Sequence, residues 1–305
     1  MNYCKIKIFV RMEIKTQEIS IPLLKEKEIK LFIKRTDQTH QHISGNKWYK
    51  LKYNLIEAKK QGFKTLLTFG GAYSNHIAAA ACAAKENGLK SVGVIRGEEH
   101  FPLNPTLQFA KEQGMKIKYV NRGDYRLKQT PEFIKGLKDK FGDFYLISEG
   151  GTNQLAIKGT EEILDVSSTQ DFVCCAVGTG GTIAGVINAS TNKQTVIGFP
   201  AIKGIDALVK DIESWTNKQS WKLINNYACG GYAKVNEKLV QFINEFNTEH
   251  DIPLDAVYTG KMMLGILDLV AKDYFPKGST ILAVHTGGLQ GNQGMRERLM
   301  IKLPS

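Results

Sequence analysis

The sequence predicts an α/β protein in which parallel strands alternate with helices. Two short apolar runs, residues 65–69 and 171–177, are each followed by a glycine-rich turn and then by a helix-forming stretch. Apolar, β-prone runs bounded by glycines are typical of buried strands, and their alternation with helices indicates layered α/β architecture. A chain of 305 residues can bury a sizeable core in one or two domains.

The first of these units joins a strand to an alanine-rich helix through Gly70 and Gly71. The helix is expected over residues 77–84, and either Ser74 or Asn75 would cap it. A helix N-terminus presents unpaired N–H groups and a partial positive charge, which suits a carboxylate or a phosphate. Most such residues are only caps, and that simpler interpretation stays open.

The second unit carries the loop Gly178–Thr182 ahead of a helix over residues 183–189. Backbone N–H groups and the hydroxyls of Thr179 and Thr182 would suit a phosphate. The alternative is a loop without a ligand, in which the glycines only turn the chain.

A dinucleotide site fits this loop poorly. Gly178 and Gly180 match the first two glycines of the dinucleotide fingerprint, but Ile183 stands at the third position. No acidic residue follows the next predicted strand, 195–199, to hold a ribose, and the Gly-Lys-Ser/Thr ending of a nucleotide triphosphate loop is absent. A small phosphate is therefore favoured over NAD or ATP.

The C-terminal half repeats the pattern of polar and glycine-rich residues at the ends of elements. Open α/β sheets bind their ligands at such strand ends. The segments are Gly230–Lys234 before a helix expected over 236–246, Val257–Lys261 before a helix expected over 262–271, and His285–Gly288 after a strand expected over 280–284.

Lys47 lies at the expected start of a helix, beside the small residues Ser44, Gly45 and Asn46. An amine in this setting could form a Schiff base with a carbonyl cofactor. Lysine is also a common exposed residue in a basic protein, so the run alone favours a solvated side chain.

Taken together, the segments resemble the D-cysteine desulfhydrase and 1-aminocyclopropane-1-carboxylate deaminase family, fold type II pyridoxal-phosphate enzymes related to the tryptophan synthase β subunit. The resemblance runs from about Pro22 to Leu299 and is closer to D-cysteine desulfhydrase. The motifs that carry it, in order, are Ser44-Gly45-Asn46-Lys47-x-x-Lys50, Gly70-Gly71-x-x-Ser74-Asn75-His76, Gly178-Thr179-Gly180-Gly181-Thr182, Tyr258-Thr259-Gly260-Lys261 and His285-Thr286-Gly287-Gly288.

The resemblance implies two lobes, each an open, mostly parallel twisted sheet flanked by helices. Residues 1–49 and 161–305 would form the large cofactor-binding domain, and residues 50–160 a smaller inserted domain. It also implies pyridoxal 5'-phosphate as the cofactor, a small amino acid as the substrate and a homodimer.

Roles carry over position by position. Lys47 would hold the cofactor as a Schiff base and act as a base, and Lys50 would lie near the phosphate. Asn75 would bond the cofactor's ring hydroxyl, and the backbone of Ser74–His76 would receive the substrate carboxylate. The remaining implied positions are Gly178, Thr179, Gly180, Gly181 and Thr182 at the phosphate, Tyr232 and Tyr258 on the substrate side, and Thr259 or Thr286 at the pyridine nitrogen. Ser74 or a tyrosine could assist proton transfer.

Two positions favour one activity over the other. The deaminase pattern has Glu where this chain has Thr259, and Gln where it has His76. A Glu beside the pyridine nitrogen would strengthen the electron sink that opening a cyclopropane needs, whereas elimination of a thiol needs less. The sequence therefore favours β-elimination from D-cysteine or a similar β-substituted amino acid, giving pyruvate, ammonia and hydrogen sulfide.

Other chemistries stay open. Tyr49 replaces an Arg that is common in relatives, and Ile77–Ala80 replaces a more polar helix start, so another D- or an L-amino acid could be the substrate. The deaminase, another pyridoxal-phosphate lyase or racemase, and a non-catalytic ligand-binding protein are the alternatives.

Composition adds few constraints. The formal charge of +11 invites a nucleic-acid partner, but the lysines are scattered among acidic residues and form no basic run. No apolar stretch approaches a membrane span. Five cysteines without C-x-x-C spacing, and histidines without ligand spacing, favour reduced thiols in the cytoplasm and no metal site. The start at Met1 or at Met12 is left undecided.

Overall fold

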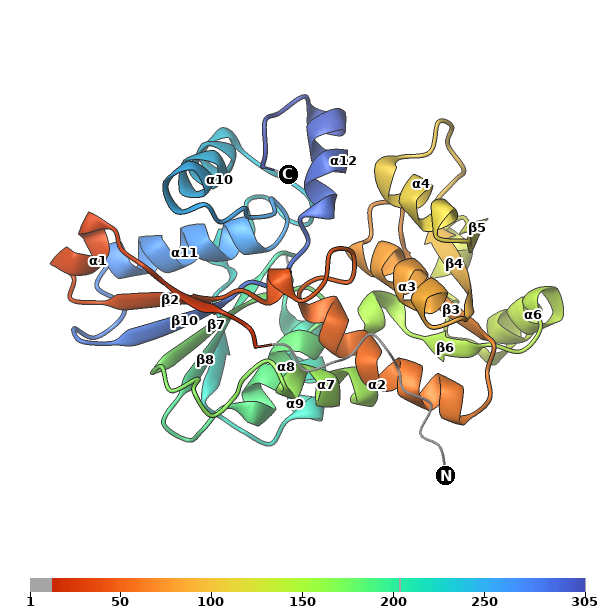
Figure 1. Ribbon diagram of the computed structural model, residues 1–305, viewed down its shortest axis with the longest axis horizontal. Coiled ribbons are helices and arrows are strands. Elements are labelled where there is room, and N and C mark those ends of the chain that lie inside the picture. Colours follow the sequence, from red (N-terminus) through yellow and green to blue (C-terminus); the bar gives the residue numbers. More distant parts are fainter. Residues whose placement is uncertain (1–12, 203, 305) are drawn as a thin grey trace.

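The computed structural model describes residues 13–202 and 204–304, so the choice between Met1 and Met12 lies outside the described residues. Two sheets lie on opposite sides of the long helix α2 (Asn46–Lys60), as Figure 1 shows. Helices flank both sheets, which confirms the predicted α/β fold class with two mostly parallel sheets.

The six-stranded sheet has the order β1-β2-β10-β7-β8-β9. Only the pairing of β1 with β2 is antiparallel. The strands are β1 (Thr16–Ile19), β2 (Lys30–Lys34), β7 (Phe172–Val177), β8 (Thr195–Pro200), β9 (Trp221–Leu223) and β10 (Thr280–Val284). The strand predicted over 280–284 has the observed bounds, and those predicted over 171–177 and 195–199 differ by one residue.

The four-stranded sheet is parallel throughout, in the order β5-β4-β3-β6. Its strands are β3 (Thr65–Gly71), β4 (Lys90–Arg96), β5 (Met115–Val120) and β6 (Tyr145–Ile147). The carboxyl ends of parallel strands meet at one edge, which is where loops carrying polar residues can gather.

The remaining helices connect and cover these strands. They are α1 (Pro22–Glu26), α3 (Asn75–Glu86), α4 (Pro105–Glu112), α5 (Arg122–Tyr125), α6 (Pro131–Phe141), α7 (Gln154–Glu161), α8 (Gly181–Ala189), α9 (Asp206–Trp215), α10 (Glu237–His250), α11 (Thr259–Ala271) and α12 (Gln290–Leu299), with short 3-10 turns at Thr36–Gln38 (η1), Glu149–Gly151 (η2) and Asn225–Tyr227 (η3). Within the described residues, no helix is long and apolar enough to cross a membrane.

One apolar cluster joins the two halves of the molecule. Leu51 and Leu55 of α2 are fully buried in it, together with Leu66 of β3 and Val173 of β7. Burying a leucine side chain contributes about 2 kcal/mol, so α2 is held from both sides. The division into domains 1–49 plus 161–305 and 50–160 stays a proposal, because a continuous core crosses between the two sheets.

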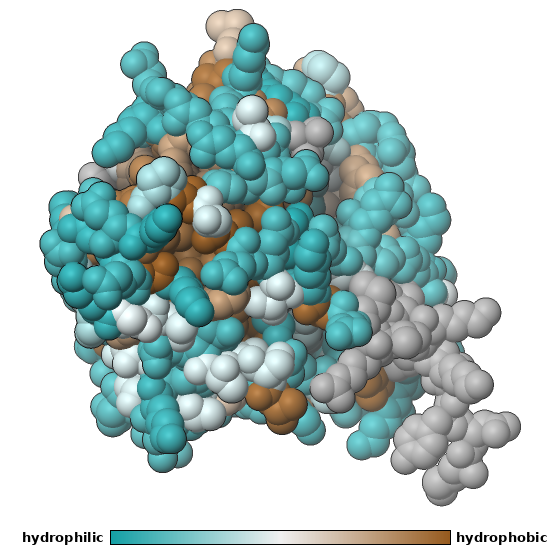
Figure 2. Space-filling view, turned by 60° about the vertical axis from the view of Figure 1, so that its left-hand side comes forward, coloured by the Kyte–Doolittle hydropathy of each residue, from teal (hydrophilic) through white to brown (hydrophobic). Residues whose placement is uncertain are grey.

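The outer face in Figure 2 is mostly hydrophilic, with hydrophobic atoms gathered in one area that hydrophilic side chains surround.

Candidate active site

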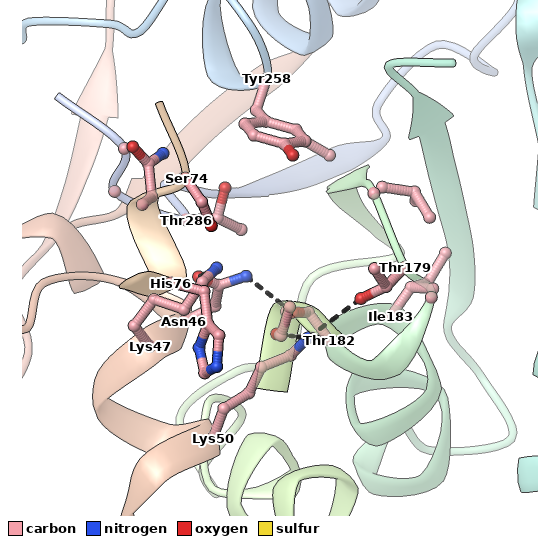
Figure 3. A pocket seen from close by; sticks show the side chains of 18 of the residues that line it. Asn46, Lys47, Lys50, Ser74, His76, Thr179, Thr182, Ile183, Tyr258 and Thr286 are labelled. Atoms are coloured by element: carbon pink, nitrogen blue, oxygen red, sulfur yellow. Dashed lines mark hydrogen bonds between the residues drawn. The ribbon is translucent and has the colours of Figure 1, made fainter. Parts of the chain in front are cut away.

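A pocket lies at the carboxyl ends of β3, β7 and β10 and beside the first turn of α2. Figure 3 shows side chains from α2, and from the loops and helices that follow strands of both sheets, converging on it. The sequence-predicted residues that line it are Lys47, Lys50, Ser74, Asn75, His76, Gly178, Thr179, Gly180, Thr182, Tyr232, Tyr258 and Thr286. Gly181 and Thr259 were predicted beside the cofactor and do not line it.

Lys47 lies on the first turn of α2, and the amine at the end of its side chain is buried. Burial lowers the pKa of Lys47 to about 8, against a smaller opposing effect of the Asp255 charge. The Nζ donates to Asn46 Oδ1 at 2.8 Å, and Asn46 Nδ2 donates to Thr182 Oγ1 at 2.8 Å. Asn46 thus ties the lysine to the glycine-rich loop, a role that the sequence did not reveal.

Lys50 follows one turn later and lies beneath that loop. Its Nζ donates to the carbonyl oxygen of Gly150 at 3.0 Å, to Thr152 Oγ1 at 2.9 Å and to Thr179 Oγ1 at 3.4 Å. Burial, and then the charge of Lys47, holds its pKa well below the usual value. All three partners are uncharged, so a bound anion would stabilise this ammonium group strongly.

The loop from Gly178 to Thr182 forms the uncapped N-terminus of α8. Gly180 has a φ of +82°, and no side chain of the described residues caps the helix. A Cβ on Gly181 would lie 2.7 Å from Thr152 Cγ2, so Gly181 allows close packing beside the loop without lining the pocket. Open N–H groups at a helix N-terminus, with a lysine beneath them, suit a phosphate.

Ser74 begins α3 on the opposite side of the pocket. Its Oγ accepts a hydrogen bond from Ile77 N at 3.4 Å, so of the two predicted caps the structure uses Ser74. Asn75 Oδ1 is buried and has no partner among the described residues. The amide is therefore available to a bound molecule.

His76 is 1 % exposed and its tautomer follows from its neighbours. Thr68 Oγ1 donates to the carbonyl oxygen of Ile147 at 2.8 Å, so it accepts from His76 Nε2, which lies 2.8 Å away. Burial, and then the charges of Lys47 and Lys50, lowers the pKa of His76 well below its usual value. The ring is neutral, and its Nδ1 has no partner among the described residues.

Two tyrosines, Tyr232 and Tyr258, line the pocket. Their ring centroids are 6.2 Å apart, with Tyr258 partly buried and Tyr232 half exposed. Burial, and then Tyr232, raises the pKa of Tyr258 well above its usual value, so its phenol stays protonated. A Cβ on Gly178 would lie 3.2 Å from Tyr258 Oη. Because glycine has no side chain, the phenol can pack closely against the loop.

The two candidates for the pyridine nitrogen differ in position. Thr286 lines the pocket, whereas Thr259 is fully buried and engaged with Asp255. Thr259 Oγ1 donates to Asp255 Oδ1 at 2.7 Å and accepts from Asp255 N at 2.8 Å.

Asp255 is the acidic residue that the sequence reading missed. Its carboxylate also accepts hydrogen bonds from the backbone N–H groups of Val257, Tyr258 and Thr259, at 2.8 to 2.9 Å. Asp255 thus satisfies the N–H group of Thr259, the first residue of α11, which begins three residues before the predicted start. An Asp just before an apolar helix is the signal that could have found it.

One further cluster resembles a metal site among the described residues, formed by His40, Cys82 and Glu86. His40 Nδ1 accepts the backbone N–H groups of His42 and Ile43 at 3.2 and 3.1 Å. The proton of a neutral ring therefore lies on Nε2, 3.5 Å from Glu86 Oε1, and that nitrogen offers no lone pair to a metal.

Comparison with known proteins decides the family. The family model for "Pyridoxal-phosphate dependent enzyme" matches residues 12–287. The chain belongs to this family.

Its relatives carry two activities in their names. The chain is 31% identical to "Putative 1-aminocyclopropane-1-carboxylate deaminase" of Pyrococcus abyssi over 88% of this chain and 87% of that protein. It is 29% identical to the bifunctional D-cysteine desulfhydrase/1-aminocyclopropane-1-carboxylate deaminase of Arabidopsis thaliana, over 86% and 73%, and 26% identical to D-cysteine desulfhydrase of Klebsiella pneumoniae, over 85% and 86%.

A solved structure agrees with this placement. A crystal structure described as an ACC deaminase homologue superposes with a TM-score of 0.83 at 26% identity, covering 95% of this chain and 94% of that one. The named relatives thus place the chain in the deaminase and desulfhydrase group, with deaminase names on the relatives of 30–31% identity.

The residues present fit pyridoxal phosphate. Lys47 offers a buried amine whose lowered pKa makes it nucleophilic, and Lys50 with the uncapped α8 offers a phosphate site. Asn75 also lines the pocket, and its Oδ1 has no hydrogen-bond partner among the described residues. These are the donors and acceptors that an aldehyde, a phosphate and a ring hydroxyl need.

Proposed function

We propose that the protein catalyses pyridoxal-phosphate-dependent β-elimination from D-cysteine or a similar β-substituted amino acid, with water consumed and pyruvate, ammonia and hydrogen sulfide released. The observation that carries this proposal is the buried amine of Lys47, with its pKa lowered to about 8 and, among the described residues, only Asn46 as its hydrogen-bond partner. Near neutral pH such an amine can lose its proton and act as a base.

The bound cofactor supplies an electron sink for the charge that develops when the α-proton leaves. Lys47 Nζ would attach the cofactor and then, once freed, take the α-proton. Asn46 keeps that amine aimed at the pocket through its own bond to Thr182. Lys50, Thr179 and the N-terminus of α8 would hold the phosphate.

The opposite wall would receive the substrate. Backbone N–H groups from Ser74 to His76 begin α3 and suit a carboxylate. Tyr258, a protonated phenol, could give a proton to the departing sulfur, with Tyr232 beside it. Ser74 is the alternative proton donor.

Thr259 supports elimination rather than ring opening. A neutral, buried hydroxyl stands where the deaminase pattern has a carboxylate, and its own proton is already donated to Asp255. A carboxylate at this position would strengthen the electron sink that opening a cyclopropane needs. Elimination of a thiolate, which is a good leaving group, depends less on that electron sink.

1-Aminocyclopropane-1-carboxylate deamination is the second candidate, because the relatives of 30–31% identity carry that name. Asp255 also favours it. The carboxylate lies beside Gly288, which lines the pocket, since a Cβ there would be 3.1 Å from Asp255 Cγ. A negative charge is therefore near the pocket even though Thr259 is neutral.

The deciding experiment measures products from the cofactor-loaded protein. D-cysteine, L-cysteine and D-serine are assayed for pyruvate, with sulfide measured for the cysteines, and 1-aminocyclopropane-1-carboxylate is assayed for 2-oxobutanoate. We expect sulfide and pyruvate from D-cysteine above all. Efficient release of 2-oxobutanoate, with little sulfide from either cysteine, would replace the first candidate by the second.

Lys47→Ala tests the catalytic assignment itself. We expect activity to fall by at least about 10³-fold and the visible absorbance of lysine-bound cofactor to vanish. Lys60→Ala, an exposed lysine on the same helix, is the control and should change neither. A Lys47→Ala protein that keeps the absorbance would contradict the assignment.

The remaining assignments are proposals on resemblance. We propose a homodimer, a small amino-acid substrate and a cytoplasmic protein without a nucleic-acid partner. The hydrophobic area in Figure 2 supports an interface between copies, because such areas are usually covered. Light scattering coupled to gel filtration measures the mass directly.

A further inference from the structure

A second concave surface, rich in cations, lies at the carboxyl edge of the four-stranded sheet. We call it the arginine pocket, and its lining residues are Arg96, Arg122, Tyr125, Arg126, Lys128 and Glu149. Arg96 ends β4, α5 follows directly on β5, and Glu149 follows β6. The polar ends of three parallel strands therefore meet here, which is the usual place for a ligand in an open sheet.

Its charge is strongly unbalanced. Three arginines and a lysine face one carboxylate, and Lys128 Nζ already lies 3.3 Å from Glu149 Oε2. Among the described residues, Arg96, Arg122 and Arg126 form no ion pair with any acidic side chain. Uncompensated guanidinium groups around one hollow repel each other, and an anion between them would remove that repulsion.

The ring of Tyr125 is a rigid surface against which two of these cations pack. It is 2 % exposed and packs edge-on against Phe69 of β3, with ring centroids 6.1 Å apart. Arg96 Cζ and Lys128 Nζ lie 5.8 and 4.8 Å from the centre of the tyrosine ring, within the range of a cation–π contact. The cations are thus placed by a buried ring.

The Tyr125 hydroxyl is buried beside the Glu149 carboxylate. Burial, and then Glu149, raises the pKa of Tyr125, so the phenol keeps its proton and is a hydrogen-bond donor at this pocket.

We propose that the arginine pocket binds a small multivalent anion, bearing phosphate or several carboxylates, at a site separate from the Lys47 pocket. Planar guanidinium groups bind both anion types through paired N–H groups. The arginine pocket and the Lys47 pocket are adjacent in the chain, because Glu149 lines the first and Gly150 lines the second. The carbonyl oxygen of Gly150 also accepts a hydrogen bond from Lys50. The anion would therefore lie close to the active site without occupying it.

Calorimetric titration of the cofactor-loaded protein tests the proposal, because the cofactor's own phosphate site is then filled. Inorganic pyrophosphate and citrate are titrated separately, which distinguishes a phosphate ligand from a polycarboxylate. We expect one equivalent of at least one of them to bind. Arg122→Ala/Arg126→Ala should weaken that binding at least about tenfold, since each charged hydrogen bond contributes substantially.

The matched control is Lys135→Ala/Lys138→Ala, which removes the same charge from exposed positions on α6. It should bind as the unchanged protein does, and circular dichroism should show both variants folded. Three results would overturn the proposal: no binding of either anion, unchanged affinity in the arginine variant, or an equal loss in both variants, which would reflect net charge alone.

Discussion

The two glycine-rich connections into α3 and α8 look alike in sequence but end differently. At α3 the Ser74 side chain accepts a hydrogen bond from Ile77 N, so the helix supplies its own cap. At α8, within the part of the chain that the structure describes, no side chain caps the helix, and Gly180 turns the chain with a φ of +82°. One connection is partly satisfied within the chain, and the other leaves its N–H groups for a ligand.

The charges around the two connections sharpen the difference. Lys50 donates to Thr179 beside α8, whereas no lysine donates to the Ser74–His76 turn among the described residues. The uncapped helix with a cation beneath it suits a doubly charged phosphate, and the capped helix suits the single charge of a carboxylate. Similar motifs can thus receive different ligands because of one cap and one lysine.

Among substitutions at the two connections, Lys50→Met should have the largest effect on cofactor affinity. The substitution keeps the length of the side chain and removes the cation beneath α8, so cofactor affinity should fall about 100-fold. The change in visible absorbance during cofactor titration measures it. Lys60→Ala serves as the control, and unchanged affinity in Lys50→Met would mean that the phosphate does not lie at α8.

Gly180→Ala should destabilise the protein by about 1–3 kcal/mol, because alanine is strained at this φ and its Cβ would lie 3.0 Å from Leu208 Cδ1. The free energy of unfolding in urea measures the loss. Gly136→Ala, in α6 with open space around the new Cβ, should instead be neutral or stabilising by up to about 1 kcal/mol. Equal losses in both would show that strain at Gly180 is not the cause.

Ser74→Ala should act at the other connection. Losing the cap should cost about 1 kcal/mol of unfolding free energy. The KM for D-cysteine should rise about tenfold with cofactor affinity unchanged, because the turn that would receive the substrate carboxylate loosens. Thr130→Ala removes a comparable cap from α6 and should lower stability without altering KM. A fall in cofactor affinity for Ser74→Ala would contradict the prediction that the α3 connection binds the substrate carboxylate and not the cofactor phosphate.

The pH dependence of cofactor capture should be the smallest effect. The pKa of Lys47 is lowered to about 8, so its amine becomes neutral and reactive as the pH rises through that value. For cofactor-free protein the neutral fraction, and with it the capture rate, should rise about fivefold from pH 7 to pH 8 and level off above pH 9. Stopped-flow absorbance measures the rate. A midpoint near the ordinary lysine value would mean that burial does not act on this amine.

Much of the fold followed from local patterns. Both ends of the strand Thr280–Val284 were predicted correctly, because a short apolar run between polar residues is typical of a buried strand. The Lys47 helix begins one residue earlier than Lys47 itself, at Asn46. Helix ends are set by caps, and α11 begins early because Asp255 lies outside the periodic pattern that predicted the helix.

The site was less predictable where segments distant in sequence meet. The contacts of Asn46 with Thr182 and of Lys50 with Thr152 join residues more than 100 positions apart, and no local pattern contains them. The hydroxyl of Thr259 is buried and forms two hydrogen bonds with Asp255, which a motif comparison cannot reveal. The motifs supplied the candidates, while packing decided which side chains reach the pocket.

The contact between Asp255 and Thr259 constrains how position 259 could acquire the carboxylate of the deaminase pattern, in evolution or by design. Thr259→Glu alone would set a second carboxylate against Asp255 in a buried place, where two like charges are costly. The hydroxyl that now donates to Asp255 would also be lost. Conversion toward the deaminase pattern therefore depends on position 255 as well, and the two substitutions should be strongly non-additive.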